Sequence, residues 1–167
     1  MGEVLEIAVG PGRNLRYYPD DVRLTGIELS PAMLKLARQE AAALGRQVDL
    51  REGDAQALEF TDESFDTVIC TLSLCTIPDD RAAIREAHRV LRPGGRFVLL
   101  EHVRSPIRRV RAGQRVLEPL FLRLEHDHLT RDPLDHLEAT GFEVESVARL
   151  KWGIVERLVA RKPKHST

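Results

Sequence analysis

Two glycines and an acidic residue near the start of the chain have the spacing of a nucleoside-binding pocket. The apolar run Val4–Val9 leads into Gly10-Pro11-Gly12, and a second apolar run, Val22–Leu29, carries Glu28 near its end. Glycine lets a backbone approach a ligand closely, and the helix start that follows offers free N–H groups. A carboxylate at the end of the neighbouring strand accepts hydrogen bonds from a ribose diol. The spacing therefore favours a nucleoside-containing ligand at the ends of two adjacent strands.

Other reactive side chains form weaker patterns. Cys70 and Cys75 are too few and too close for a disulfide framework and fit a reducing cytosol, and we expect Cys75 to be a small buried residue. Glu125-His126-Asp127-His128 has metal-ligand residue types, but adjacent residues rarely converge on one ion, so we expect no metal and a polar rim. The arginines from Arg104 to Arg115 are typical of a solvated face, with attraction of an acidic substrate or a membrane surface as the alternative.

The composition is that of one globular domain spanning residues 1–167. The chain is 43% apolar and 31% charged, and its formal net charge of −1 provides no global field for nucleic acid or an anionic membrane. No apolar run reaches the roughly 20 residues of a membrane span, and the amino terminus lacks a signal-peptide pattern. We therefore expect a cytoplasmic protein with a small-molecule substrate, no nucleic-acid partner and no stable membrane insertion.

Apolar runs alternate with helical stripes along the chain. Ser30 and Pro31 suit the start of a helix and Gly45 suits its end. The expected strands are Val4–Val9, Val22–Leu29, Val48–Arg51, Phe65–Leu72, Arg96–Val103, Phe142–Leu150 and Ile154–Lys162, the last two forming an antiparallel hairpin around Trp152-Gly153. Further helices are expected at Asp79–Leu91 and between Asp132-Pro133 and Gly141, with a turn at Arg92-Pro93-Gly94-Gly95.

This alternation predicts an α/β fold: a Rossmann-like, doubly wound, mostly parallel sheet. Such sheets bind ligands at the carboxyl ends of their strands. The segment Arg104–Thr130 breaks the rhythm, because it is basic at first and apolar from Val116 to Leu124. We expect it to form a helical insert that covers the mouth of the pocket.

These motifs resemble the class I S-adenosylmethionine-dependent methyltransferases, in the branch of ubiquinone/menaquinone-type and small-molecule methyltransferases. Val4–Gly12 matches the first motif of that family, with Ala8 where the family usually has glycine. Gly26–Leu34 resembles its ribose-binding motif and Gly53-Asp54-Ala55 its adenine motif. The resemblance covers residues 3–103 and implies a seven-stranded sheet with an antiparallel last strand.

A closer local likeness is to the methyltransferase-like thiol S-methyltransferases. It is carried by Cys70–Cys75, Val90–Gly95, Glu101-His102-Val103, Glu118-Pro119 and Leu129-Thr130-Arg131. We take this likeness as a pointer to the type of substrate.

The family resemblance implies S-adenosylmethionine as methyl donor, S-adenosylhomocysteine as product, and a set of donor-binding residues. Glu28 would accept hydrogen bonds from both ribose hydroxyls, and Asp54 would accept one from the adenine amino group. Glu6 would orient the glycine loop or the ligand's amino group. The implied donor-binding residues are Glu6, Ala8, Gly10, Pro11, Gly12, Asn14, Glu28, Leu29, Met33, Gly53, Asp54, Ala55, Cys70, Thr71 and Leu72.

His102, at the end of the fifth expected strand, is the candidate catalytic residue. It could take a proton from a small, apolar thiol, hydroxyl or amine acceptor, and a packed strand-end histidine is the alternative. Because the donor is already activated, the protein must mainly align the two reactants and exclude water.

Two other functions stay open on the sequence. Gly-x-Gly followed by an acid also serves nicotinamide-dependent oxidoreductases, although Leu15 stands where Gly-x-Gly-x-x-Gly needs its third glycine. The other alternative is a non-catalytic cofactor-binding or scaffold domain. The family normally places one or two lid helices before the first strand, whereas this sequence begins directly on that strand at Met1-Gly2-Glu3, with the lid helices absent. Three explanations stay open: a misplaced start, a trimmed domain, or an open site. We accordingly expect an open pocket, with a homodimer covering it or disordered loops beside it.

Overall fold

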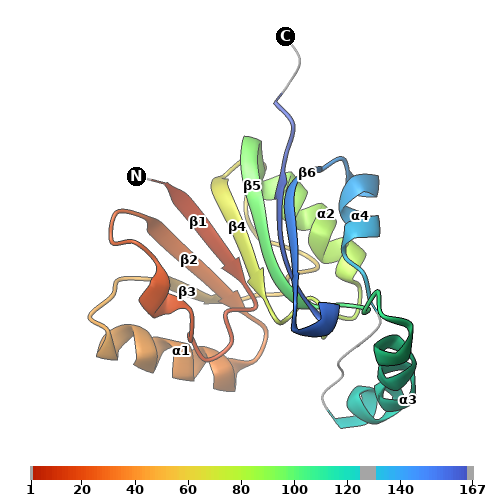
Figure 1. Ribbon diagram of the computed structural model, residues 1–167. Coiled ribbons are helices and arrows are strands. Elements are labelled where there is room, and N and C mark those ends of the chain that lie inside the picture. Colours follow the sequence, from red (N-terminus) through yellow and green to blue (C-terminus); the bar gives the residue numbers. More distant parts are fainter. Residues whose placement is uncertain (1, 125–130, 165–167) are drawn as a thin grey trace.

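The computed structural model describes residues 2–124 and 131–164. Within these residues a seven-stranded sheet has the order β3-β2-β1-β4-β5-β7-β6 (Figure 1). Strands β1 to β5 pair in parallel, and β7 runs antiparallel to both β5 and β6. The predicted α/β architecture with a reversed last strand is therefore confirmed.

The elements have the following bounds. The strands are β1 Glu3–Ile7, β2 Arg23–Glu28, β3 Asp49–Glu52, β4 Phe65–Thr71, β5 Leu91–His102, β6 Glu143–Leu150 and β7 Val155–Arg161. The helices are α1 Pro31–Ala43, α2 Asp80–Val90, α3 Arg108–Leu124 and α4 Leu134–Thr140, with single turns η1 Leu15–Tyr17 and η2 Lys151–Gly153.

Helices cover both faces of the sheet, α1 on one and α2 with α4 on the other (Figure 1). Successive side chains of a strand point to opposite faces, so Val4 and Leu5 enter different hydrophobic cores. Val4 packs in the core that contains Ala37 of α1, and Leu5 packs in the core that contains Ile84 of α2. These two cores hold β1 in the middle of the sheet.

Capping residues mark the ends of three helices, among them Ser30 and Gly141, which the sequence predicts at helix ends. The Ser30 hydroxyl accepts the N–H of Met33 at the start of α1, and the Asp79 carboxylate accepts the N–H of Ala82 at the start of α2. Gly141 ends α4 with a φ of 94°. Ser30, two residues after Glu28, therefore fixes the start of α1 close to that carboxylate.

The prediction that residues 92–95 form a turn before the fifth strand is wrong, because these residues lie inside β5. Strand β5 already begins at Leu91, which is buried and pairs with Phe65, whereas Arg96 pairs with Thr67. Residues 92–95 thus form an irregularity inside the strand, with Gly94 at a φ of 84°. Because Leu91 is buried, it pairs with β4 before the chain reaches Gly94 and Gly95. A local sequence pattern does not show which residue will be buried in this way.

The carboxyl ends of β1, β2, β4 and β5 meet at one edge of the sheet, the lower edge in Figure 1. Helix α3 follows β5 and projects from that edge (Figure 1). Its role as a cover of the pocket stays a prediction. No helix in the part of the chain that the structure describes has the length and apolar character to cross a membrane.

Candidate functional site

The loop after β1 is held in a conformation that glycine adopts at little cost. Ala8, Gly10 and Gly12 all have positive φ, at 53°, 56° and 84°. A Cβ on Gly12 would lie 2.9 Å from Leu15 and 3.1 Å from the backbone of Ala37, so this glycine also lets the loop pack on α1. A Cβ on Gly10 would meet nothing within 4 Å, so the backbone faces open space there. Ala8 occupies a left-handed position that costs a non-glycine residue about 1–2 kcal/mol.

Glu28 joins this loop to the start of α1. Its Oε2 accepts the N–H of Gly10 and its Oε1 accepts the N–H of Ser30, each at 2.9 Å. A carboxylate has about four acceptor positions, so one on each oxygen is left for a ligand. The structure thus brings the predicted glycine and the predicted acid into direct contact at the ends of β1 and β2.

Asp54 lies two residues beyond β3 and is already bonded to its neighbour. Its Oδ1 accepts both the backbone N–H and the side-chain Nε2 of Gln56, at 2.9 and 3.0 Å. The Gln56 Oε1 in turn accepts the N–H of Asp79. Gln56, which the sequence reasoning missed, therefore links Asp54 to the start of α2, and a ligand amino group would share Asp54 with it.

Two apolar side chains beside Glu28 are exposed. Leu29 is 62% exposed and Met33 is 43% exposed, although neither is charged or polar. Ala55 is buried, and Gly53 donates its N–H to the Glu28 carbonyl at 3.2 Å. Exposed apolar side chains next to free carboxylate acceptors suit a flat ring attached to a sugar.

Glu6 is turned inward and holds the loop. Its carboxylate is 2% exposed and accepts Asn14 Nδ2 at 2.7 Å and the Tyr18 hydroxyl at 2.9 Å. Burial raises the pKa of Glu6, and the two hydrogen bonds oppose that rise. Burial and the neighbouring Glu6 raise the pKa of Tyr18, which therefore stays a hydrogen-bond donor. Of the two roles predicted for Glu6, the geometry supports orientation of the loop.

A second buried carboxylate, Glu101, organises the loop after β4. Its Oε1 accepts the N–H of Ser73 at 3.2 Å, the N–H of Leu74 at 3.1 Å and the Cys70 thiol at 3.3 Å. Burial raises the pKa of Glu101, and burial also raises the pKa of the Cys70 thiol. The sequence offered one signal for Glu101, an acid at the end of an apolar strand, which is the same signal that identified Glu28.

The residues at the end of β4 divide between core and edge. Cys70 is fully buried, and its side chain points toward Glu101. The Thr71 carbonyl accepts the Ser73 hydroxyl at 2.9 Å, and Leu72 is 45% exposed at a φ of 52°. Thr71 and Leu72 thus lie at the edge that carries Gly10 and Glu28, and the Cys70 side chain does not.

His102 is the last residue of β5 and is half-buried opposite Val155 of β7. It lies at the same edge of the sheet as Glu28. The acidic and histidine-rich residues 125–128 are outside the described residues. Among the residues that the structure describes, no cluster of His, Cys, Asp or Glu could hold a metal ion.

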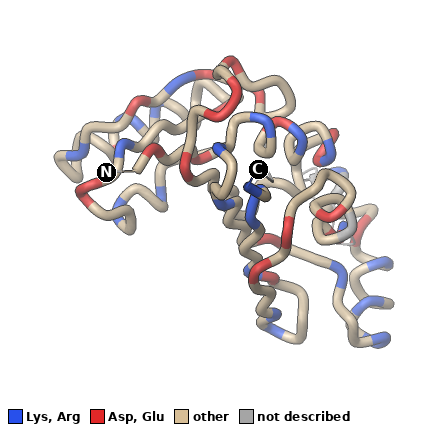
Figure 2. Tube along the Cα trace, turned by 90° about the horizontal axis from the view of Figure 1, so that it is seen from above, with Lys and Arg blue, Asp and Glu red and all other residues tan. Residues whose placement is uncertain are grey.

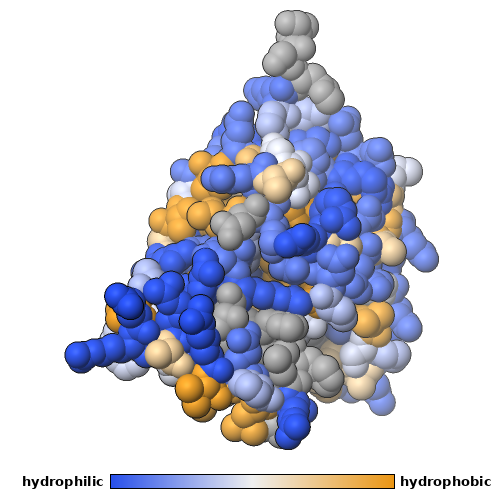
Figure 3. Space-filling view, turned by 90° about the vertical axis from the view of Figure 1, so that its right-hand side faces the viewer, coloured by the Kyte–Doolittle hydropathy of each residue, from blue (hydrophilic) through white to orange (hydrophobic). Residues whose placement is uncertain are grey.

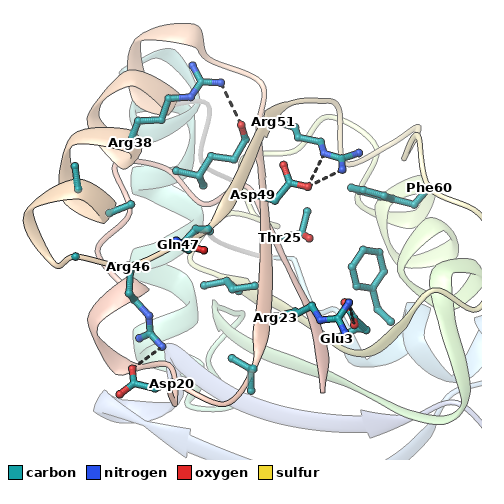
Figure 4. Close-up of a pocket in the computed structure, with 18 of the residues that line it drawn as sticks. Glu3, Asp20, Arg23, Thr25, Arg38, Arg46, Gln47, Asp49, Arg51 and Phe60 are labelled. Carbon is teal, nitrogen blue, oxygen red and sulfur yellow. Dashed lines mark hydrogen bonds and ion pairs between the residues drawn. The ribbon is translucent and has the colours of Figure 1, made fainter. Parts of the chain in front are cut away.

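A broad cavity of about 1150 Å³ lies elsewhere, beside α1 and the early residues of β2 and β3 (Figure 4). Its arginines are engaged: Arg46 with Asp20, Arg51 with Asp49, and Arg38 with a backbone carbonyl. Parallel sheets bind ligands at their carboxyl ends, so volume alone does not make this cavity the functional site.

Comparison with known proteins distinguishes the expected methyltransferase from the nicotinamide-dependent oxidoreductase. A family model described as a methyltransferase domain matches residues 5–99. The chain belongs to the methyltransferase-domain family. This match includes the glycine loop, Glu28 and Asp54, and it ends just before Glu101. The family is that of the predicted methyltransferase, so the nicotinamide-dependent alternative loses its support.

The relatives in this methyltransferase family differ in their acceptors. The chain is 39% identical over 103 residues to a phosphatidylethanolamine N-methyltransferase of Cereibacter sphaeroides, covering 60% of this chain and 51% of that protein. It is 33% identical over 162 residues to the human thiol S-methyltransferase TMT1A, covering 91% of this chain and 66% of that protein. The chain therefore spans about half to two thirds of the length of these curated relatives.

A solved structure shows the same fold over nearly the whole chain. A SAM-dependent methyltransferase of Methanosarcina mazei superposes with a TM-score of 0.78 at 24% identity, covering 98% of this chain and 93% of that one. At this identity the likeness concerns the fold, because one fold serves many activities.

The residues at the edge fit S-adenosylmethionine, the methyl donor of this family. Open space at Gly10 leaves room for a close approach, and the two free acceptor positions of Glu28 match a vicinal diol. Leu29 and Met33 offer an exposed apolar surface for adenine. The donor is a cation, and the carboxylates of Glu28 and Asp54 give this edge the opposite charge.

Proposed function

We propose that the protein transfers a methyl group from S-adenosylmethionine to a small, apolar acceptor that bears a thiol, hydroxyl or amine. One observation carries the proposal: the Glu28 carboxylate is fixed by the N–H groups of Gly10 and Ser30 beside open space at the strand ends. A carboxylate held in this way is preorganised for a ribose diol, because it need not reorder when the ligand arrives.

The bound donor supplies an electrophilic methyl group on a sulfonium. The chain's own residues bind and align the reactants. Glu28 and Asp54 orient the nucleoside, Leu29 and Met33 pack against its base, and backbone carbonyls at Thr71 and Leu72 accept from its ammonium group. Holding two reactants in line contributes most of the acceleration when the electrophile is already activated.

His102 is the proposed general base. A half-buried imidazole at the end of β5 lies at the same edge as the donor-binding residues and can accept a proton on a ring nitrogen from a thiol, hydroxyl or ammonium acceptor. The alternative is a role in packing alone, in which case transfer depends on alignment.

The acceptor class rests on the sequence likeness to thiol S-methyltransferases and on the apolar residues that follow β5. Amine and thiol acceptors appear in the names of the relatives, so both belong in the test. A turnover assay that measures S-adenosylhomocysteine release should be run with apolar thiols, phenols and amines. Turnover with one class supports the proposal. Calorimetric binding of S-adenosylhomocysteine without turnover on any class would favour a non-catalytic cofactor-binding domain.

A further inference from the structure

Helix α3 stands apart from the rest of the molecule. It makes no extensive contact with another helix or strand in the described part of the chain, and it projects beyond the end of β5 (Figure 1). It contains five arginines and a single glutamate, Glu118. Basic and acidic segments are interspersed over most of the trace, whereas basic segments gather at its right-hand margin, where α3 lies (Figure 2).

The helical repeat places three of the five arginines of α3 on the side opposite most of its apolar residues. At 3.6 residues per turn, Arg108, Arg111 and Arg115 fall on one side of the helix. Val110, Leu117, Leu120 and Phe121 lie on the other side of the helix, and Leu117 and Leu120 are the exposed ones among them, at 48% and 53%. Arg109 and Arg123 lie at the border between the two sides, next to Leu120 and the exposed Val116. In the space-filling view this lobe, at the lower left, shows strongly hydrophilic atoms above an apolar lower margin (Figure 3).

A second exposed apolar feature is tied to the base of α3. Trp152, the one tryptophan of the chain, is 77% exposed in the corner between β6 and β7. Lys151 and Trp152 both have positive φ, at 47° and 60°, a backbone strain that elsewhere marks functional positions. The Trp152 carbonyl accepts the Ser105 hydroxyl at 2.7 Å, and the same hydroxyl accepts the N–H of Ile107, directly before α3.

We propose that α3 and the Trp152 corner together form a surface that binds the interface of an anionic lipid bilayer. A helix that carries arginines on one side and exposed leucines on the other lies in the headgroup region, where its apolar side enters the acyl boundary. Tryptophan prefers the same depth, and arginines near the surface are attracted by anionic lipid headgroups. This is adsorption to one leaflet, in agreement with the finding that no described helix spans a membrane.

The charge pattern favours lipid over the other occupants of such a face. A second copy packed on the exposed leucines would leave Arg108 and Arg115 of each helix facing away from the contact, where it offers them no opposite charge. Nucleic acid would engage the arginines but would leave Leu117 and Leu120 in water. A bilayer with anionic headgroups satisfies both faces of α3 at once. The proposal does not depend on methyl transfer, although it would place the edge that carries Glu28 close to acceptors dissolved in a membrane.

The test uses the whole protein and vesicles of two compositions. Phosphatidylcholine vesicles that contain phosphatidylglycerol should co-sediment the protein, and pure phosphatidylcholine vesicles should bind it at least tenfold more weakly. Because Trp152 is the single tryptophan, its emission maximum should shift to shorter wavelength only when the anionic vesicles are present. Raising the salt concentration should weaken binding, because salt screens exposed charges.

Two variants separate the two faces of α3. Leu117→Ser with Leu120→Ser should reduce binding to anionic vesicles by roughly a hundredfold, because both apolar side chains that enter the acyl boundary are replaced by polar ones. Arg108→Gln with Arg115→Gln should reduce both binding and its salt dependence. Leu36→Ser serves as the matched control, since Leu36 is 46% exposed on α1 and its loss should leave binding unchanged.

Three results would overturn the proposal. They are equal binding to both kinds of vesicle, unchanged binding by the two leucine substitutions, and the absence of any Trp152 emission shift. A dimer that the leucine substitutions convert to a monomer, with no vesicle binding by either form, would assign α3 to a contact between copies instead. Binding to a DNA or RNA oligonucleotide but not to vesicles would also exclude the lipid surface.

Discussion

Replacing Glu28 by glutamine tests both the fold of the donor loop and the proposed recognition of ribose. The wild-type carboxylate accepts one backbone N–H on each oxygen, from Gly10 and from Ser30. An amide has one oxygen and one NH₂ group, so in either orientation its NH₂ faces one of these two donors. One charge-assisted hydrogen bond is lost, and the other becomes a neutral one. Hydrogen bonds to charged groups contribute about 1.5–3 kcal/mol, and the half-buried position allows water to replace part of this. We expect the free energy of unfolding in urea to fall by about 1–2 kcal/mol.

The same substitution should weaken binding of S-adenosylhomocysteine more than it weakens the fold. A diol held by two carboxylate oxygens would face one oxygen and one NH₂ group, which costs roughly 1.5–3 kcal/mol of binding free energy, or about tenfold to a hundredfold in Kd. Isothermal titration calorimetry measures this directly. Glu52→Gln is the matched control, because Glu52 pairs with Glu28 across β3 and β2 and is exposed. Its Kd should match that of the wild type.

The free energy of unfolding and the Kd for S-adenosylhomocysteine test different parts of the argument. If Glu28→Gln lowers stability but leaves Kd unchanged, Glu28 only holds the glycine loop and the assignment of ribose to it is refuted. If neither quantity changes, the hydrogen bonds from Gly10 and Ser30 do not contribute as the geometry implies. If Glu52→Gln also loses affinity, the negative charge of the sheet edge attracts the ligand in general, and Glu28 has no specific role toward the ribose.

Three further substitutions test other parts of the site. Ala8→Gly should raise the free energy of unfolding by about 0.5–1 kcal/mol in urea denaturation, because it relieves a φ of 53°, whereas Ala42→Gly in α1 should lower it by about 1 kcal/mol. Burial raises the pKa of Glu101 above its ordinary value of 4.5, so the folded state holds that proton more tightly and stability falls as the pH rises from about 4.5 through the raised pKa. Glu101→Gln should flatten this part of the pH profile of urea unfolding, and an unchanged slope would contradict the argument. His102→Ala should slow turnover most at low pH and leave donor affinity unchanged; a rate unaffected at every pH would exclude His102 as the base.

Features that depend on nearby residues could be predicted from the sequence. The strand from Val4, the cap at Ser30 and the Gly10–Glu28 arrangement follow from local periodicity, capping chemistry and the spacing of adjacent strands. The β6–β7 hairpin around Trp152 was predicted for the same reason. These signals are strong because a strand or helix end imposes one or two residue types over a few positions.

Contacts between distant side chains could not be predicted. Glu101 accepts the thiol of Cys70, 31 residues earlier, and Tyr18 donates to Glu6 across the loop. No local pattern encodes such pairs, because they depend on how the strands pack and on which side chains lose water. Residues 92–95, expected to form a turn before the strand, lie inside β5 as an irregularity for the same reason, since burial of Leu91 extends the ladder.

Four carboxylates lie at or just beyond the ends of β1, β2, β3 and β5, and burial divides them into two kinds. Glu6 and Glu101 are almost fully buried, burial raises the pKa of each, and they accept hydrogen bonds from the loops that follow β1 and β4. Glu28 and Asp54 are half-buried, and their carboxylates retain acceptor capacity beyond the hydrogen bonds they already make. An acid at the end of an apolar strand is therefore one sequence signal for two physical roles. The buried pair holds the loops in place, so its loss should alter stability and its pH dependence, whereas loss of the half-buried pair should chiefly alter affinity for the donor.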